Sequence, residues 1–288
     1  MIGTIDDDVA AALEVAGLRA RSWREVSTIR ASAVRRSAYR IDLGSGEIIK
    51  ARRLEDAGTA RRLFEVRQEL PDAFVPAFMC HGPVLLERWV EGEILGSTPP
   101  SDAQLRQAGL LLAGLHVTPA VAGQPVRRRE RTAAWRDEAE RGLGTIVEAG
   151  ALDASVAAEL RRILERADPG LATTGLTHVD FCGENMLVDQ ARRLRVFDND
   201  RVGTSMLGFD LARTWYRWDL ESPAWASFQA VYASGMSSLE ALETLDFWGI
   251  VAPVKSAVFR IGADRARVDV PLDRLRRIAG AGGCGSRL

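Results

Sequence analysis

The stretch that decides the fold is His178 to Asn185, which reads HVDFCGEN, followed after a short interval by Val196 to Asp200, which reads VFDND. Asn185 leads directly into the apolar run MLV, and Asp198 closes the next apolar segment, LRVF. Two short strands separated by the turn-forming residues 189–191 would bring Asn185 and Asp198 side by side. Amide and carboxylate oxygens are ligands that magnesium accepts, so this pair predicts a magnesium site.

Asp180 lies five residues before Asn185 in the same loop, where its carboxylate can accept a proton from an attacking hydroxyl. A base, a metal-binding Asn and a metal-binding Asp in this order are typical of phosphoryl transfer. The same residue types also occur in loops for local reasons, because Asp and Asn favour turns. The apolar strand after Asn185, the spacing to Asp198 and the later segment GFDLAR, residues 208–213, favour the phosphoryl-transfer interpretation.

These segments resemble the aminoglycoside phosphotransferase and choline kinase family, the small-molecule branch of the protein-kinase-like fold. The loop of that family reads roughly HGD-hydrophobic-HxxN, its metal segment IDxD/E, and a DLA sequence follows. Here the three segments read THVDFCGENMLV, RVFDND and GFDLAR. The chain departs from the pattern at two positions, since Val179 replaces the usual glycine and Cys182 replaces the usual second histidine. Neither departure removes the base or a metal ligand.

The resemblance covers nearly the whole chain and implies an α+β, bilobal protein-kinase-like fold. In such a fold a small N-lobe carries an antiparallel sheet and a helix, and a larger C-lobe is mainly helical. We expect the N-lobe over residues 1–86, a hinge over 87–92, and over 93–288 a C-lobe with the catalytic and metal-binding loops and the acceptor pocket. A chain of 288 residues with 47% hydrophobic content is sufficient for a substantial core.

Local patterns in the first 86 residues predict two strands followed by a helix. Tyr39–Leu43 alternates like a strand, a turn follows, and Glu47–Lys50 returns as its partner. The segment Ala57–Leu70 has helical spacing and stops before a proline. We also expect a short helix over Val9–Ala16 and a last strand over Gly82–Glu87.

The remainder of the chain predicts mainly helices. Ser101 to Gln104 is a capping-box signal for a helix that runs to His116. Residues 132–149 and 154–167 suggest a helical hairpin, and the region from Asp210 to about Ile278 is again mainly helical. The glycine-rich end, residues 279–288, is expected to fray.

The nucleotide half of the site is predicted around Lys50, which ends an apolar strand where this fold places a phosphate-contacting lysine. Glu65 and Glu69 share one face of the following helix, and we choose Glu65 as the partner that holds Lys50 toward the phosphates. Lys50 and Asp198 should face each other across the cleft between the lobes, where small-molecule sites usually form. The adenine is expected to bind backbone groups of Arg88 and Val90.

A glycine-rich loop is missing where the fold would place one. The residues between Val26 and Tyr39 contain no glycine, although glycine lets a backbone approach phosphate closely. The absence leaves GTP use or weak nucleotide affinity as alternatives to ordinary ATP binding. Trp89 is either a lid on the nucleotide pocket or a packing residue.

The resemblance implies a magnesium-dependent kinase with these roles. Asp180 orients and deprotonates the acceptor hydroxyl, while Asn185 and Asp198 hold the metal. Asp200 either touches a second metal or orders its loop. His178 is expected to brace the catalytic loop, and Asp210 either does likewise or caps the following helix.

The acceptor is expected to be a small molecule, with an aminoglycoside or another antibiotic as the leading candidate and choline or homoserine as alternatives. A cationic acceptor would suit the acidic residues near the presumed pocket, although solvated helix faces explain them equally well. These residues are Asp137, Glu138, Glu140, Asp219 and Glu221. Two other protein classes compete with a kinase: a catalytically impaired nucleotide-binding regulator and a non-catalytic helical binding protein.

Composition excludes several kinds of partner. A formal net charge of −1 provides no global field for nucleic acid or an anionic membrane. The three cysteines are widely spaced, which argues against a disulfide framework or a zinc site. Neither a signal peptide nor an apolar run long enough to span a bilayer is visible. We therefore expect a cytoplasmic protein that acts as a monomer or homodimer.

Overall fold

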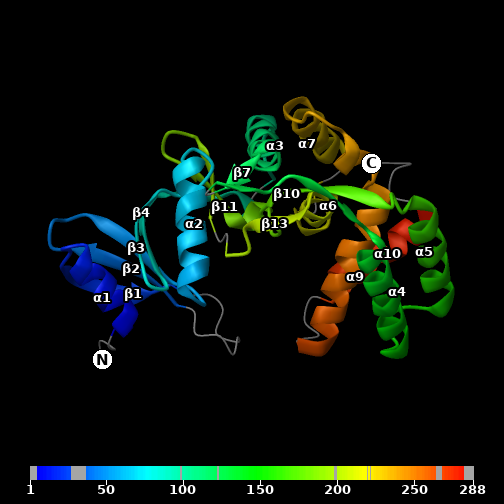
Figure 1. Ribbon diagram of the computed structural model, residues 1–288, viewed down its shortest axis with the longest axis horizontal. Helices are drawn as coiled ribbons and strands as arrows, with labels where there is room; N and C mark the ends of the chain where they lie inside the picture. Colours follow the sequence, from blue (N-terminus) through cyan, green and yellow to red (C-terminus); the bar gives the residue numbers. More distant parts are fainter. Residues whose placement is uncertain are drawn as a thin grey trace. The chain divides into compact units, whose positions relative to one another are not determined.

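The computed structural model describes residues 5–26, 37–97, 99–121, 123–197, 200–218, 220, 222–263 and 268–281 (Figure 1). The chain divides into two compact units. The first comprises Met1–Ile94, Val121–Gly123 and Met186–Asp200, and the second comprises Leu95–Ala120, Gln124–Asn185 and Arg201–Leu288. The lobe limits drawn from the sequence at residues 86 and 93 stay a prediction.

The first unit is built on a five-stranded antiparallel sheet with the strand order β1-β2-β3-β5-β4. Its strands are β1 (Ala20–Glu25), β2 (Ser37–Leu43), β3 (Ile48–Arg53), β4 (Ala77–His81) and β5 (Val84–Arg88). The strands expected around residues 39–43, 47–50 and 82–87 are therefore confirmed, while β1 and β4 were not predicted. Successive side chains of each strand point to opposite faces, so the sheet offers two chemically different surfaces.

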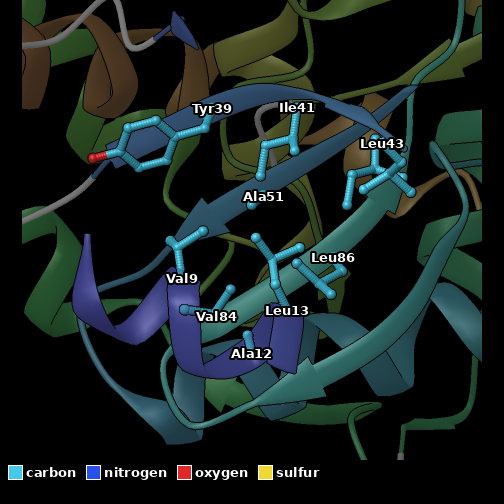
Figure 2. Close-up of a cluster of buried hydrophobic side chains, with 10 residues drawn as sticks. Val9, Ala12, Leu13, Tyr39, Ile41, Leu43, Ala51, Val84 and Leu86 are labelled. Atoms are coloured by element: carbon cyan, nitrogen blue, oxygen red, sulfur yellow. The ribbon is translucent and has the colours of Figure 1, made fainter. Parts of the chain in front are cut away.

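One face of this sheet is apolar and is covered by helix α1 (Asp7–Val15). Val9, Ala12 and Leu13 of the helix pack against apolar side chains of β2, β3 and β5 (Figure 2). The Asp6 carboxylate caps the helix by accepting a hydrogen bond from the Asp8 amide at 3.0 Å. This face supplies the hydrophobic core of the first unit.

The opposite face carries charged side chains and is covered by helix α2 (Ala57–Glu69). The helix begins after Asp56, whose carboxylate accepts a hydrogen bond from the Thr59 amide, and ends before Pro71 as predicted. Helix α2 packs on strands β4 and β5 (Figure 1). Because Lys50 and Glu87 are paired in the register of β3 and β5, both side chains belong to this face.

A second sheet of the first unit contains β6 (Gly92–Ile94), β11 (Met186–Asp189) and β12 (Leu194–Val196) in the order β12-β11-β6. The predicted hairpin after the catalytic loop is confirmed, with Met186 paired to Val196. A side chain at Gly92 would place its Cβ 2.2 Å from the Val188 carbonyl oxygen, so glycine is required where β6 meets β11.

The second unit is mainly helical and surrounds a three-stranded sheet with the order β13-β10-β9. Its helices are α3 (Asp102–Val117), α4 (Ala133–Glu148), α5 (Ala154–Ala167), α6 (Leu207–Trp218), α7 (Ser222–Gly235), α8 (Glu240–Glu243), α9 (Leu245–Ala263) and α10 (Asp269–Ala281). Its strands and short helical turns are η1 (Leu95–Ser97), β8 (Gln124–Pro125), β9 (Arg128–Arg131), β10 (Leu171–Thr177), η2 (Gly183–Asn185) and β13 (Gly203–Met206), and β7 (Ala120–Val121) lies at the boundary between the units.

The predicted capping box at Ser101 and Gln104 is present at the start of α3, and the helical hairpin appears as α4 and α5. The glycine-rich end departs from expectation, because α10 continues through residues 279–281 before the described chain ends. The antiparallel sheet of the first unit and the helices of the second confirm the predicted α+β fold class. Among the described residues, no helix is both long enough and apolar enough to cross a membrane.

Candidate active site

The catalytic loop is held by Asp210, which lies in the first turn of α6 and is fully buried. Its carboxylate accepts hydrogen bonds from the backbone amides of His178 and Val179, each at 2.7 Å. A third contact, at 3.1 Å, comes from Nε2 of His116 on α3. Burial would raise the pKa of Asp210, but these hydrogen bonds and His116 lower it, so the carboxylate stays ionised. The structure thus favours the bracing role over a helix cap.

A buried chain of polar groups continues from Asp210 to helix α7. The Tyr232 hydroxyl lies 2.7 Å from Nδ1 of His116, whose other ring nitrogen contacts Asp210. A His116 ring protonated on Nε2 satisfies both contacts, with Tyr232 as the donor to Nδ1. Helices α3, α6 and α7 therefore support the loop together.

Asp180 is surrounded by three donors within the second unit. Its Oδ1 accepts from Arg217 at 3.0 Å and from Arg213 at 3.3 Å. Its Oδ2 accepts from the Asn185 side-chain amide at 3.1 Å. Because Oδ1 accepts two hydrogen bonds and Oδ2 accepts one, Oδ2 keeps the lone pair that can face an attacking hydroxyl. Burial would raise the Asp180 pKa, but Arg217 and then Arg213 more than offset this effect and lower it.

Asn185 is buried and rigidly oriented at the end of η2. Its Nδ2 donates to both the Asp180 carbonyl, at 2.8 Å, and the Asp180 carboxylate. These two bonds fix the amide so that its carbonyl oxygen remains available, which is the atom a magnesium ion would need. The side chain therefore fits the metal-binding role that the sequence predicted.

Both departures from the family pattern have a structural consequence. Val179 has a φ of +66°, a left-handed conformation that is unfavourable for a β-branched residue. The Asp210 carboxylate on its amide and the Arg213 side chain on its carbonyl hold it there. Cys182 is buried beside the base, and burial raises the pKa of its thiol to about 11. It therefore fills space as an unreactive thiol.

In the first unit, Lys50 lies 5.9 Å from the ring centroid of Phe197, the residue directly before Asp198. Asp198 itself lies outside the described residues, so its contact with Lys50 stays a prediction. Lys50 is also opposite Glu87, a fully buried carboxylate of β5. Burial would raise the pKa of Glu87, but Arg67, Arg52 and Lys50 lower it below its ordinary value.

The predicted lysine partner on α2 is placed differently. Among the described residues, Glu65 lies near the Cys80 thiol on β4, whose pKa is raised by burial and, to a lesser extent, by the Glu65 charge. The carboxylate opposite Lys50 belongs instead to Glu87. The role of Glu65 in nucleotide binding stays a prediction.

The hinge residues have distinct backbone environments. The Arg88 amide donates to the Pro76 carbonyl at 2.9 Å, which leaves the Arg88 carbonyl as its possible contact for an adenine. The Val90 amide makes no hydrogen bond with another described residue and could donate to the base. Trp89 donates to Glu91 at 2.7 Å and lies under the Arg40 guanidinium, contacts that suit a packing role.

Asp200 forms an ion pair with Arg52 of β3. This contact favours the loop-ordering role for Asp200, while its role as a metal ligand stays a prediction. The described residues contain no group of three or more His, Cys, Asp or Glu side chains that could hold a metal. The segment with the strongest predicted ligand, Asp198, is not among them.

The acidic residues proposed for a cationic acceptor are partly accounted for by local ion pairs on α4. Arg136 lies 3.8 Å from both Asp137 and Glu140, and Lys255 pairs with Glu138. Asp219 and Glu221 lie outside the described residues. The α4 carboxylates are therefore already balanced by cations.

Sequence reasoning missed the arginines on α6 and the buried carboxylate of β5. One signal was available: GFDLARTWYR places Arg213 and Arg217 four residues apart, on the face of α6 that begins with Asp210. A second feature of the sequence indicates that the surroundings of Lys50 needed closer attention: Lys50 and Lys255 are the only lysines in a chain with 38 Lys and Arg residues. A compact ammonium at position 50 is therefore unusual for this chain.

The left-handed backbone at Val179 predicts that glycine will be more stable than alanine at this position, the reverse of the usual order. Val179→Gly and Val179→Ala both remove the branched side chain, but an L-residue in this conformation costs about 1–2 kcal/mol that glycine avoids. We expect Val179→Gly to exceed Val179→Ala in free energy of unfolding by about 1 kcal/mol in denaturant titrations.

The same two substitutions at Val147 in helix α4 provide the control for Val179. There alanine should be the more stable variant by about 1 kcal/mol, because glycine is unfavourable inside a helix. If alanine is also the more stable residue at position 179, the loop backbone stores no strain there.

Comparison with known proteins supports one family. The model of the phosphotransferase enzyme family, APH, matches residues 49–248. A macrolide 2'-phosphotransferase type I has a similar structure, with a TM-score of 0.65 and 13% identity over 96% of this chain and 98% of that chain. For a macrolide 2'-phosphotransferase from Brachybacterium faecium, the TM-score is 0.63 at 15% identity, over 94% and 98% of the chains.

A choline kinase from Streptococcus pneumoniae has a TM-score of 0.63 and 14% identity over 95% of this chain and 96% of that chain. Identities this low show a shared fold alone. No curated protein matches the chain. The family model spans more than half of the 288 residues and confirms the family expected from the motifs, so this chain belongs to the phosphotransferase enzyme family.

Proposed function

We propose that this phosphotransferase moves the γ-phosphate of ATP or GTP to a hydroxyl of a small molecule in a magnesium-dependent reaction. The observation that carries the proposal is the environment of Asp180. One carboxylate oxygen is held by Arg217 and Arg213, and the other is shared with Asn185. A carboxylate fixed in this way can accept an acceptor hydroxyl from one direction.

The residues described above are proposed to serve distinct parts of the reaction. Asp180 orients the acceptor hydroxyl through Oδ2 and takes its proton as the bond to phosphorus forms. Lys50 binds phosphate oxygens, and the backbone of Arg88 and Val90 binds the base. Asn185 and Asp198 would hold magnesium, which neutralises phosphate charge when it is bound. Asp200, paired with Arg52, orders the segment that carries Asp198.

As acceptor we propose an antibiotic, with an aminoglycoside as the first candidate. The names of similar structures add macrolides and choline to the panel that should be tested. A cationic acceptor gains little support from α4, because the acidic residues there are paired with Arg136 and Lys255. We also propose a cytoplasmic location, which the free thiols of Cys80 and Cys182 support, and a monomer or homodimer as the assembly.

The test is phosphate transfer from ATP and from GTP, with and without magnesium, across this panel of acceptors. Transfer to a small molecule that requires magnesium would support the proposal. Nucleotide binding without transfer to any acceptor would favour the catalytically impaired regulator instead.

Asp180→Asn should lower kcat by roughly 10² to 10⁴, because a general base contributes about that factor. Nucleotide affinity should change little, since the carboxamide keeps the size of the side chain. Steady-state kinetics and calorimetry measure the two effects. Asp168→Asn, which alters a partly buried carboxylate paired with Arg136 in the same unit, is the control. A variant that retained most of its turnover would remove Asp180 from this role.

Asp198→Ala should abolish the part of nucleotide affinity that depends on magnesium, because it removes a negatively charged oxygen ligand. Calorimetric titration with nucleotide, in magnesium and in chelator, provides the measurement. Asp189→Asn changes another carboxylate of the same hairpin and should keep the magnesium dependence. Unchanged affinity in the Asp198 variant would show that the metal is held elsewhere.

Arg217→Gln should move the acidic limb of the kcat/KM profile to higher pH. Arg217 is the largest of the charges that lower the Asp180 pKa, so its removal raises that pKa and protonates the base earlier as pH falls. Arg136→Gln, which removes an arginine beside Asp168 instead, should leave the limb in place. A limb that does not move would mean that another group controls it.

A further inference from the structure

Glu87 is an acidic residue inside the buried part of strand β5. Its side chain is 1% exposed, and the two preceding residues, Leu85 and Leu86, are fully buried leucines. The residue that follows, Arg88, is the first of the two proposed adenine contacts. A buried carboxylate is costly unless cations and hydrogen bonds compensate it, so its partners reveal its role.

Three cations from two neighbouring elements, α2 and β3, surround Glu87. Arg67 of α2, whose side chain is fully buried, forms an ion pair with Oε1 of Glu87 and donates to the Val75 carbonyl at 3.2 Å. Arg52 of β3 lies 3.5 Å from the same carboxylate oxygen. Lys50 is directly opposite Glu87 in the strand register. The carboxylate thus joins α2, β3 and β5 at one point.

The network extends to the segment proposed to hold the metal. Arg52 contacts Glu87 and also forms an ion pair with Asp200, two residues after Asp198. Lys50 lies beside the ring of Phe197, directly before Asp198. The cations around Glu87 therefore contact the described residues on either side of Asp198 in the sequence: Lys50 lies beside Phe197, and Arg52 pairs with Asp200. All of these groups belong to the first unit.

Stability alone does not explain this arrangement. A buried ion pair is often no more stabilising than well-packed apolar residues of similar volume. A leucine at position 87 would continue the run of Leu85 and Leu86, and an apolar residue at 67 would suit the buried face of α2. The buried charges of Glu87 and Arg67 are explained if they keep Lys50, the proposed phosphate-binding lysine, in one position.

We propose that Glu87 is a positioning residue of the nucleotide site. Its carboxylate lies opposite Lys50 in the strand register, where its charge orients the ammonium, and it fixes Arg52, which in turn pairs with Asp200. This inference rests on the proposed function. It assigns the negative charge that compensates Lys50 to Glu87 on β5, whereas the sequence suggested Glu65 on α2. Glu87 acts through Lys50 and Arg52 and has no contact with the reacting atoms.

The test uses Glu87→Gln, which keeps the shape of the side chain and removes its charge. Asp6→Asn is the matched control, because Asp6 is another buried carboxylate of the first unit and lies 3.7 Å from Arg53 of the same strand β3. Asparagine also preserves the helix cap. We expect Glu87→Gln to weaken magnesium-dependent binding of ATP or GTP about tenfold or more, the size of a lost charged hydrogen bond. Asp6→Asn should not weaken binding.

A second variant separates positioning from folding. Glu87→Leu combined with Arg67→Met removes both members of the most buried pair, and Arg52 keeps Asp200 as its ion-pair partner. We expect its melting temperature to be close to that of the wild type while nucleotide affinity stays low. If this double variant binds nucleotide like the wild type, the pair is structural only and the proposal is overturned.

Lysine reactivity provides a readout that does not depend on turnover. Lys50 and Lys255 are the only lysines, so trace acylation followed by peptide mass spectrometry reports Lys50 with Lys255 as an internal reference. Removal of the Glu87 charge should shift the pH midpoint of Lys50 acylation downward, because a nearby carboxylate favours the charged ammonium. The midpoint of Lys255 should stay in place.

The outcomes distinguish this inference from the proposed function. Wild-type protein that binds neither ATP nor GTP in magnesium would overturn both. Wild-type protein that binds nucleotide, with Glu87→Gln binding equally well and an unchanged Lys50 midpoint, would overturn the role of Glu87 alone. Weakened binding together with a lower midpoint would establish it.

Discussion

The catalytic loop depends on one carboxylate that has no access to water. Asp210 binds two consecutive backbone amides, those of His178 and Val179, directly before the proposed base. A buried ionised group must have its hydrogen bonds satisfied, so the loop and the helix hold each other in place. The unfavourable backbone of Val179 persists because these bonds fix it on one side and Arg213 on the other. The position of Asp180 follows from that anchor.

Each unit contains a charged side chain, Asp180 or Lys50, that is oriented by neighbouring groups, but the neighbouring groups differ in kind. In the second unit, Asp180 is oriented by arginines on one helix and by an amide of its own loop. In the first unit, Lys50 belongs to a sheet face on which a buried carboxylate compensates several cations. In both cases a charge with a proposed role in the reaction is compensated by partners that are buried or partly buried, an arrangement that limits reorganisation during a reaction.

Sequence patterns predicted the parts of the structure that are local. The loop with Asp180 and Asn185, the hairpin that follows it and the capped helix at Ser101 each depend on residues close together in the chain. Spacing therefore carries the information. The pattern placed Lys50 correctly on the strand that follows the turn, but it ended that strand too early, because β3 continues through Arg53.

Contacts between distant segments left much weaker signals. Glu87 and Arg67 are 20 residues apart, His116 and Asp210 are 94 apart, and nothing in either local pattern specifies the pairing. Helix spacing placed Glu65 and Glu69 on one face of the helix, and the choice of Glu65 followed the family's spacing to Val75 and Pro76. Neither kind of spacing shows which charges a side chain will meet. Of the cations that pair with the acidic residues of α4, Arg136 lies on the same helix and could be identified from its spacing, but Lys255 comes from α9 and could not be identified without the packing of the helices.

The chain of contacts from Tyr232 through His116 to Asp210 has a consequence for folding. Its members come from α7, α3 and α6, and 116 residues separate His116 from Tyr232. Contacts between such distant segments require large loops to close, so they form after the local helices. The catalytic loop therefore becomes ordered late in the folding of the second unit. Local opening of α7 would remove the Tyr232 contact of His116, and with it one of the supports of Asp210.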